Sequence, residues 1–322
     1  MILKLKILTV GILLCLPVQF CLAQAPPFSD QFLTNSFLTN PAITGTSRQA
    51  PLTVSIRQQW MGIKSAPVYQ TISYHKSLIE KGKRFNYRGF LNRGENSYGK
   101  IGIGGGLFNF KYGSVTQMGL HLDYAYHVYL KKGRVSFGLA PLYQQFAINT
   151  GNFIRPDGNI LDNLLDPAAR EVTHFFDAAA GVHYSSGKWF AGLSGVELFN
   201  SKVRFGSIQL DPAGDASQNY FLARTFYAYG GITPMIGKNF TIKPSVILKY
   251  SQPAGIGIQA NILVSYNDNI EAGFLYRYKE SYGFFLGLKA MNVLIRYQFE
   301  TPAGSTAGSR FLTNQILVGY LL

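Results

Sequence analysis

The sequence predicts an all-β protein, a transmembrane antiparallel β-barrel of about fourteen strands that follows an N-terminal signal peptide. Three observations predict it. The chain begins with a secretory leader, long segments alternate between apolar and polar residues, and Phe, Tyr and Gly are abundant. Aromatic residues are typical of the belts at the two membrane interfaces, and glycines are typical of tight turns.

Residues 1–23 have the three parts of a secretory signal peptide. Lys4 and Lys6 give a positive start, residues 7–16 are apolar, and Cys21-Leu22-Ala23 offers a cleavage site. The apolar part is too short to span a membrane as a helix. Both cysteines of the chain fall in this leader, so the mature protein is expected to lack disulfides and thiolate metal sites.

The mature chain is strongly basic. Removal of two leader lysines leaves 30 − 2 = 28 basic residues against 16 acidic ones, a net charge of +12. Such a balance suits anionic outer-membrane lipid, lipopolysaccharide or an acidic protein. Secretion makes nucleic acid the poorest candidate, and we expect no nucleic-acid partner.

Apolar and polar residues alternate over lengths that suit a strand crossing a bilayer. In Thr116–Leu130 the even positions carry apolar residues such as Leu122 and Tyr124, and the odd positions include His121 and Asp123. A soluble β-sandwich would also alternate, with its apolar face inward. Segments of about ten or more residues, with Tyr and Phe near the ends of the apolar faces, favour the barrel.

The alternating segments are 52–60, 68–78, 100–110, 116–130, 133–147, 173–185, 188–198, 222–232, 240–251, 254–266, 270–278, 281–289, 293–299 and 313–322. An even number of strands returns the chain to its starting side, so both termini are expected in the periplasm of an outer-membrane protein. We expect residues 24–51 to form an N-terminal periplasmic segment and residues 52–322 to form the barrel. Gly102 and Gly104–Gly106 weaken segment 100–110, and they are expected either to relieve crowding or to mark a bend there.

The connections alternate in length. Short turns at 131–133, 185–187, 267–269 and 290–292 all fall on one side of the predicted barrel, and long connections at 149–172, 199–221 and 300–312 fall on the other. This asymmetry is typical of short periplasmic turns and long external loops.

Residues 79–99 break this rule, because they form a long connection on the short-turn side. The segment is basic, and its cations are Lys81, Lys83, Arg84, Arg88 and Arg93, against Glu80 and Glu95. One interpretation is an ordinary solvated loop. The other is a periplasmic docking surface for an acidic partner, on which charge would steer association.

Histidines and carboxylates gather on the predicted lumen face: His75, His121, His127, His183, Asp123 and Asp177. A barrel lumen is polar without any catalytic role, and no G-x-S-x-G nucleophile motif accompanies them. His121 and His127 lie about 20 Å apart along a strand, so they cannot share a metal ion. The glycine cluster 102–106 lacks the register of a phosphate loop. We therefore expect no catalytic residue, no cofactor and no metal.

Six charged residues are also predicted to face the lumen: Arg57, Lys243, Lys249, Glu271, Arg277 and Arg296. They could select a diffusing solute or form internal salt bridges. The long connections 149–172 and 199–221 could fold inward, so an occluded lumen is the favoured prediction.

Several motifs resemble a known family in order and spacing. They are Pro26-Pro27-Phe28-Ser29-Asp30-Gln31-Phe32, Asn40-Pro41-Ala42 with Gly45, Arg57-Gln58-Gln59-Trp60, Phe108-Asn109, Tyr124-Ala125-Tyr126-His127, Phe190-Ala191-Gly192-Leu193-Ser194 and Leu198-Phe199-Asn200. Together they resemble the PorP/SprF family of type IX secretion system outer-membrane proteins of the Bacteroidota, over essentially the whole mature chain. Asp30 departs from the family pattern as an insertion between Ser29 and Gln31.

The resemblance implies a non-enzymatic barrel of the type IX secretion and gliding system. Its implied role is export, anchoring or surface display of a large secreted adhesin, in contact with periplasmic motor or peptidoglycan-linked proteins. The alternative left open by the residues is an outer-membrane channel or transporter for small solutes or hydrophobic compounds.

Overall fold

The computed structural model describes residues 32, 35–47, 50–78, 100–149, 170–199, 202–203, 220–221, 223–237, 239–251, 254–303 and 311–322. The predicted signal peptide, residues 1–23, lies outside them. Among the described residues there is no helix long and apolar enough to cross a membrane.

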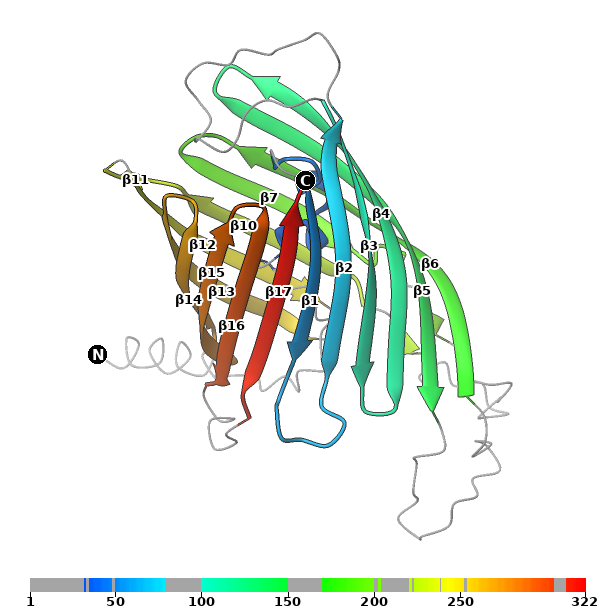
Figure 1. Ribbon diagram of the computed structural model, residues 1–322. Coiled ribbons are helices and arrows are strands. Elements are labelled where there is room, and N and C mark those ends of the chain that lie inside the picture. The colour runs from blue at the N-terminus through cyan, green and yellow to red at the C-terminus, as the bar shows by residue number, and fades with distance from the viewer. Residues whose placement is uncertain are drawn as a thin grey trace, which may run out of the picture.

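Fourteen antiparallel strands close into a barrel (Figure 1). The first strand pairs with the last, with Val54 opposite Val318, and the ring also closes between β10 and β12. β11 (Met235–Ile236) extends the edge of β12, and β8 (Lys202–Val203) pairs with β9 (Tyr220–Phe221) apart from the ring. The ring consists of β1 (Pro51–Gln58), β2 (Val68–Leu78), β3 (Ile101–Tyr112), β4 (Val115–Leu130), β5 (Gly133–Asn149), β6 (Arg170–Ser185), β7 (Trp189–Val196), β10 (Thr225–Ile232), β12 (Phe240–Ser251), β13 (Gly255–Tyr266), β14 (Ile270–Arg277), β15 (Ser281–Ala290), β16 (Val293–Pro302) and β17 (Thr313–Leu321). These strands confirm the fourteen predicted segments.

The distribution of side chains is inverted relative to a soluble protein. On β1, Leu52, Val54 and Ile56 face outward and are exposed, whereas Thr53 and Ser55 are buried in the lumen. The same alternation runs through β4 and β15. Apolar residues face outward because the bilayer is their solvent, and closing the ring satisfies the backbone hydrogen bonds that lipid cannot satisfy.

The glycine-rich strand β3 is paired along its whole length on one side and nearly so on the other. It pairs continuously with β2 and with β4 from Ile101 to Lys111. The glycines Gly102 and Gly104–Gly106 therefore do not interrupt the ladder on either side, and their contacts are described below.

The short turns lie at the end of the barrel that carries both ends of the ring. Ala50 and Leu322 exchange backbone hydrogen bonds of 3.3 and 3.1 Å there, and Figure 1 shows the C-terminus beside the start of β1. The turns after β4, β6, β13 and β15 share this end, as the sequence predicts. Two-residue and three-residue turns also occur at the opposite end, after Tyr112 and Arg277, so the asymmetry is weaker than expected.

The segment before β1 does not extend away from the barrel. The sequence predicts a periplasmic segment over residues 24–51, but its described part, residues 35–47, lies within the lumen. Two short 3-10 helices, η2 (Ser36–Leu38) and η3 (Pro41–Ile43), form there, and η3 contacts the inner faces of β4, β5 and β6. The expectation is corrected for these residues, because this stretch carries buried side chains that the wall of the barrel covers.

Candidate functional site

Residues 35–47, called the plug here, occupy part of the lumen and define its chemistry. Asn40 anchors the plug and is fully buried. Its Oδ1 accepts a hydrogen bond of 2.9 Å from the backbone N–H of Ala42, which caps η3, with Pro41 at the first helical position. Its Nδ2 lies 3.1 Å from the carbonyl oxygen of Val182 and 2.9 Å from the hydroxyl of Tyr229.

The plug rests on two glycines of the wall. Gly138 on β5 and Gly181 on β6 are paired across the sheet and face inward. A Cβ on Gly138 would lie 2.1 Å from the backbone nitrogen of Ala42, and one on Gly181 would lie 2.1 Å from Oδ1 of Asn40. Any larger residue at either position would collide with the plug. The plug can lie this close to the wall only because both positions are glycine.

Gly102, at the start of the glycine cluster of β3, has the same role. A Cβ on Gly102 would lie 2.1 Å from the carbonyl oxygen of Thr44, and one on Gly104 would lie 3.0 Å from the Cγ2 atom of Thr44. The prediction that these glycines relieve crowding is therefore confirmed. At Gly102 the crowding comes from the plug, whereas a Cβ on Gly105 or Gly106 would lie 2.7 Å from atoms of His121 on the neighbouring strand β4. The backbone N–H of Gly45, which has a φ of 70°, donates to Nδ1 of His75 at 3.2 Å.

Aromatic packing holds the plug from its other faces. Phe37 is almost completely buried, with its ring centroid 4.9 Å from that of His75 and 5.4 Å from that of His121. Just before the plug, the ring of Phe32 lies 4.8 Å from that of Tyr229. Burial of these side chains stabilises the segment within the barrel.

The predicted lumen histidines all face inward, and each has a structural partner. His121 pairs with Asp123 at 2.6 Å, His127 with Ser136 at 2.8 Å and His183 with Tyr229 at 2.9 Å, in addition to the contact of His75 with Gly45. Asp177 also faces inward, and its carboxylate accepts from the N–H groups of Ala178 and Phe199. In the part of the chain that the structure describes, no three His, Cys, Asp or Glu residues converge as a metal site.

A buried ionic layer crosses the half of the lumen that lies away from the termini. Glu300 on β16 receives hydrogen bonds from Arg57 on β1 at 2.7 Å and from Arg277 on β14 at 2.6 Å. Gln298 donates to the same carboxylate. One carboxylate therefore serves two guanidinium groups, all of them less than a tenth exposed. Such a triad is sensitive to the loss of one partner, because the charges left behind are desolvated.

Four of the six charged residues predicted to face the lumen form internal salt bridges, as one of the two interpretations expects. They are Arg57, Glu271, Arg277 and Arg296. Arg296 pairs with Glu271 at 3.1 Å in a more accessible position. Lys243 lines the cavity described next, and Lys249 shares the inward parity of Ile247 and Ser251 on β12.

The lumen is filled at the level of the ionic layer. Arg57, Gln144, Tyr227, Gln298 and Gln315 come from strands around the ring, and none is more than 2 % exposed. A water-filled pore would leave such side chains accessible. The predicted occlusion is thus observed in the described residues, but the plug and the wall side chains cause it. Most of the loops 149–172 and 199–221, to which the prediction attributed it, lies outside the described residues.

A cavity of about 750 Å³ remains at the end of the lumen that carries the termini. The plug forms one side of it through Asn35 and Phe37, and Lys243, Lys289 and Arg296 stand on other parts of its wall. The plug therefore fills the lumen unevenly, beside β3 to β7 rather than beside β12 to β17.

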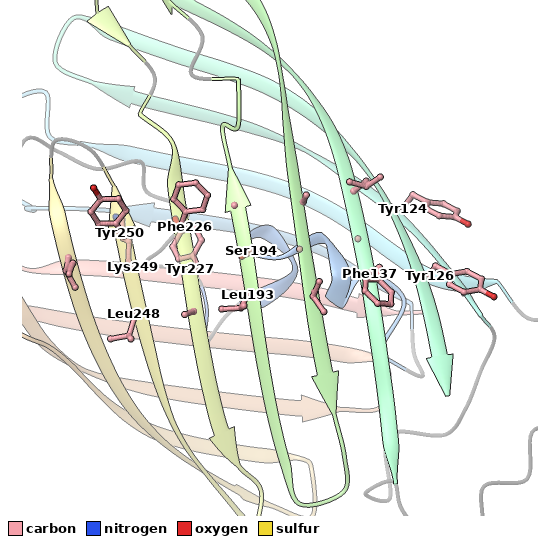
Figure 2. A pocket seen from close by; sticks show the side chains of 18 residues that line it. Tyr124, Tyr126, Phe137, Leu193, Ser194, Phe226, Tyr227, Leu248, Lys249 and Tyr250 are labelled. Atoms are coloured by element: carbon pink, nitrogen blue, oxygen red, sulfur yellow. The ribbon is translucent and has the colours of Figure 1, made fainter. Parts of the chain in front are cut away.

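A second hollow lies on the lipid-facing outside of the barrel. An apolar groove of about 950 Å³ crosses β5, β6, β7 and β10 (Figure 2). The small residues Ala180, Gly195 and Ala228 line the groove and leave it hollow. Larger aromatic residues surround them: Tyr124, Tyr126, Phe137, Phe226 and Tyr250. This groove lies on the lipid side of the wall, and Gly138 and Gly181, which contact the plug on the lumen side, also line it.

The predicted docking residues Lys81, Lys83, Arg84, Arg88 and Arg93 lie outside the described residues. The described residues on either side of them, Leu78 at the end of β2 and Ile101 at the start of β3, lie at the end of the barrel that carries the termini. Sequence reasoning missed the plug. The signal for it in the sequence is Asn40 followed by Pro41, a typical start of a short helix, whereas the opposition of Gly138 and Gly181 on β5 and β6 comes from the strand pairing.

A closed antiparallel barrel with an apolar outer face and a polar, filled lumen defines an outer-membrane protein. The chain belongs to the family described as type IX secretion system membrane protein PorP/SprF, whose model matches residues 21–320. This family is a family of secretion-system membrane barrels and not of enzymes. No curated protein matches the chain.

Solved structures share the barrel shape at very low sequence identity. The chain is similar to the outer membrane protein Omp33 of Acinetobacter baumannii, with 7% identity and a TM-score of 0.46, covering 87% of this chain and 100% of that one. It is also similar to the toluene transporter TodX of Pseudomonas putida, with 11% identity and a TM-score of 0.48, covering 89% and 93%. These likenesses concern shape alone.

The contact of the plug with Gly138 and Gly181 makes a testable prediction. Starting at Gln24, the chain contains no cysteine, so Thr44→Cys is a unique reporter at a fully buried plug position. Adding Gly138→Val should raise its rate of maleimide labelling by roughly tenfold or more, because the displaced plug exposes the thiol. The matched control is Gly257→Val, since a Cβ there meets its nearest atom only at 3.9 Å. Equal labelling in both variants would show that Gly138 is not needed to hold the plug in the lumen.

The ionic layer makes a second prediction. Glu300→Gln should lower the free energy of unfolding by about 3–5 kcal/mol, because two buried guanidinium groups lose the carboxylate that they share. The control is Glu271→Gln, whose pair with Arg296 is partly exposed and should cost only about 1 kcal/mol. Urea titration of both variants in lipid vesicles measures the difference. A loss at Glu300 no larger than at Glu271 would show that the triad is not a stabilising feature.

Proposed function

We propose that this protein is a non-conducting outer-membrane scaffold of the type IX secretion and gliding system. It supports export, anchoring or surface display of a large secreted adhesin and contacts periplasmic motor or peptidoglycan-linked components. The observation that carries the proposal is the filled lumen. Residues 35–47 pack against glycines of the barrel wall. The ionic layer of Arg57, Glu300 and Arg277 fills the half of the lumen away from the termini. The described lumen therefore offers no path for a solute.

We also propose that both termini face the periplasm. The ends of the ring meet at Ala50 and Leu322, on the side of the short turns after β4, β6, β13 and β15. Short turns typically face the periplasm in such barrels. In this orientation the cavity that adjoins the plug opens toward the periplasm, and the ionic layer lies toward the cell surface.

Deletion of the gene tests the scaffold role. The deletion strain should lose a large secreted protein from its surface, while its uptake of nutrients and hydrophobic compounds stays normal. Quantitative proteomics of washed cells and medium, together with uptake assays, measures both. Complementation with the intact gene is the control.

The rival function, a solute channel, predicts the reverse outcome. It also predicts a steady open conductance for the purified protein in a planar bilayer, whereas a scaffold with a filled lumen should show none. Normal surface display combined with impaired uptake would therefore replace the scaffold with the channel.

Segment 79–99 is proposed as the periplasmic docking surface. Its support is its basic charge and its position between β2 and β3 on the proposed periplasmic side. Reversal of Lys81, Lys83 and Arg84 to Glu should lower co-purification of periplasmic type IX components, because charge steers and orients such contacts. The matched control reverses Lys131 and Lys132, which lie in a short exposed turn at the same end of the barrel. Unchanged recovery of partners with the first variant would remove the segment from the proposal.

A further inference from the structure

The loop between β1 and β2 ends in exposed apolar side chains at the end of the barrel opposite the termini. Trp60, Met61 and Ile63 are 37 %, 41 % and 40 % exposed. Leu312, just before β17, is exposed beside them, and the backbone N–H of Met61 donates to its carbonyl oxygen at 2.8 Å. These four residues are called the apolar tip here.

A row of amide side chains separates the apolar tip from the lipid-facing belt. On β1, Gln58 follows the outward residue Ile56 and precedes Trp60. On β17, Asn314 stands between Ile316 and Leu312 in the same way. Gln58 and Asn314 lie opposite each other in the strand pairing.

Two further outward amides continue the row on β2 and β3. Asn109 donates to Gln70 at 3.1 Å, and both face away from the lumen. Amides are costly in hydrocarbon, so the row marks where the apolar belt of the bilayer ends on these strands. The apolar tip therefore lies beyond the belt rather than within it.

The backbone of the loop holds a defined and strained shape. Trp60 and Ser65 have φ values of 51° and 61°, in the left-handed region that bulky residues rarely adopt. Such conformations persist where the surrounding structure imposes them, and they cluster at binding and switching sites.

Backbone hydrogen bonds on both sides impose this shape. The N–H of Gly113 donates to the carbonyl oxygen of Ser65 at 3.0 Å, and the N–H of Gln59 donates to that of Pro67 at 2.9 Å. The N–H of Trp60 reaches Oγ1 of Thr313 at 3.4 Å. Anchoring in lipid headgroups would need only exposed apolar side chains, whereas a protein contact needs them in a fixed arrangement.

Two cations flank the apolar tip. Lys64 is exposed within the loop, and Lys111 is exposed on the outward face of β3, opposite Val68 at the start of β2. A patch with a central Trp and flanking lysines suits a partner that presents apolar side chains beside carboxylates.

We propose that the apolar tip is a docking surface for a protein at the cell surface, through a contact segment of apolar side chains flanked by Asp or Glu. The proposal rests on the proposed function insofar as the docked protein is secreted cargo. The tip holds that cargo at the rim of the barrel, and the closed lumen takes no part in the contact.

The test replaces the tip in the full-length protein. The triple variant Trp60→Ser, Met61→Ser and Ile63→Ser is expressed in the deletion strain, and secreted proteins are quantified on washed cells and in the medium. We expect the retained amount of a surface protein to fall by roughly tenfold, the loss typical of removing a central aromatic anchor. The matched control is Met291→Ser, because Met291 is a fully exposed methionine with positive φ in a turn at the opposite end.

A second variant tests the charge and does not disturb the strained loop. Lys64→Glu with Lys111→Glu should lower retention of the same protein, and the loss should shrink as salt is raised, because exposed charges are screened. Lys131→Glu with Lys132→Glu is its control at the other end of the barrel.

The outcomes separate this inference from the function on which it rests. If the deletion strain loses the surface protein and both tip variants retain it, the docking surface is overturned and the scaffold role survives. If the deletion strain itself retains every surface protein, the scaffold role fails and the docking surface fails with it. If the triple variant is folded in detergent but no longer accumulates in the outer membrane, while the charge variant displays its cargo normally, the tip is a lipid anchor and the proposal is wrong.

Discussion

The close contact between the plug and the glycines of β5 and β6 is the constraint on which the other features depend. A wall built from larger residues would push residues 35–47 away from their present position and disturb the hydrogen bonds of Asn40 to Val182 and Tyr229. With the glycines in place, the plug buries Phe37 against His75 and His121. The polar lumen of the barrel thereby acquires a small hydrophobic core of its own.

The plug and the ionic layer divide the lumen between them. The plug fills the side of β3 to β7 near the middle of the barrel, and the triad of Arg57, Glu300 and Arg277 ties β1, β14 and β16 together on the other side. A buried triad is a weak source of net stability, but it tolerates little rearrangement, because each charge depends on the others. A barrel filled in this way suits a rigid platform, on which functional contacts lie at the two rims.

The motif Arg57-Gln58-Gln59-Trp60 illustrates how one short stretch serves three environments. Arg57 points into the lumen and joins the ionic layer, Gln58 points outward at the edge of the lipid belt, and Trp60 leaves the strand in a left-handed conformation. The alternation of a strand explains the first two placements. The third depends on hydrogen bonds from neighbouring loops.

Alternation along single strands was enough to establish the barrel, the number of its strands and the inward direction of His75, His121, His127 and His183. It sufficed because a strand that faces lipid on one side and polar groups on the other must repeat every two residues. It was also enough to place Arg57, Arg277 and Glu271 in the lumen, but not to pair them, since partners such as Glu300 lie on other strands. The plug could be decided only by tertiary structure. Residues 35–47 have no strand periodicity, and the glycines that admit them are far away in sequence on β3, β5 and β6. The role of these glycines depends on the closed ring, which brings the backbone of the wall into contact with the backbone of the plug.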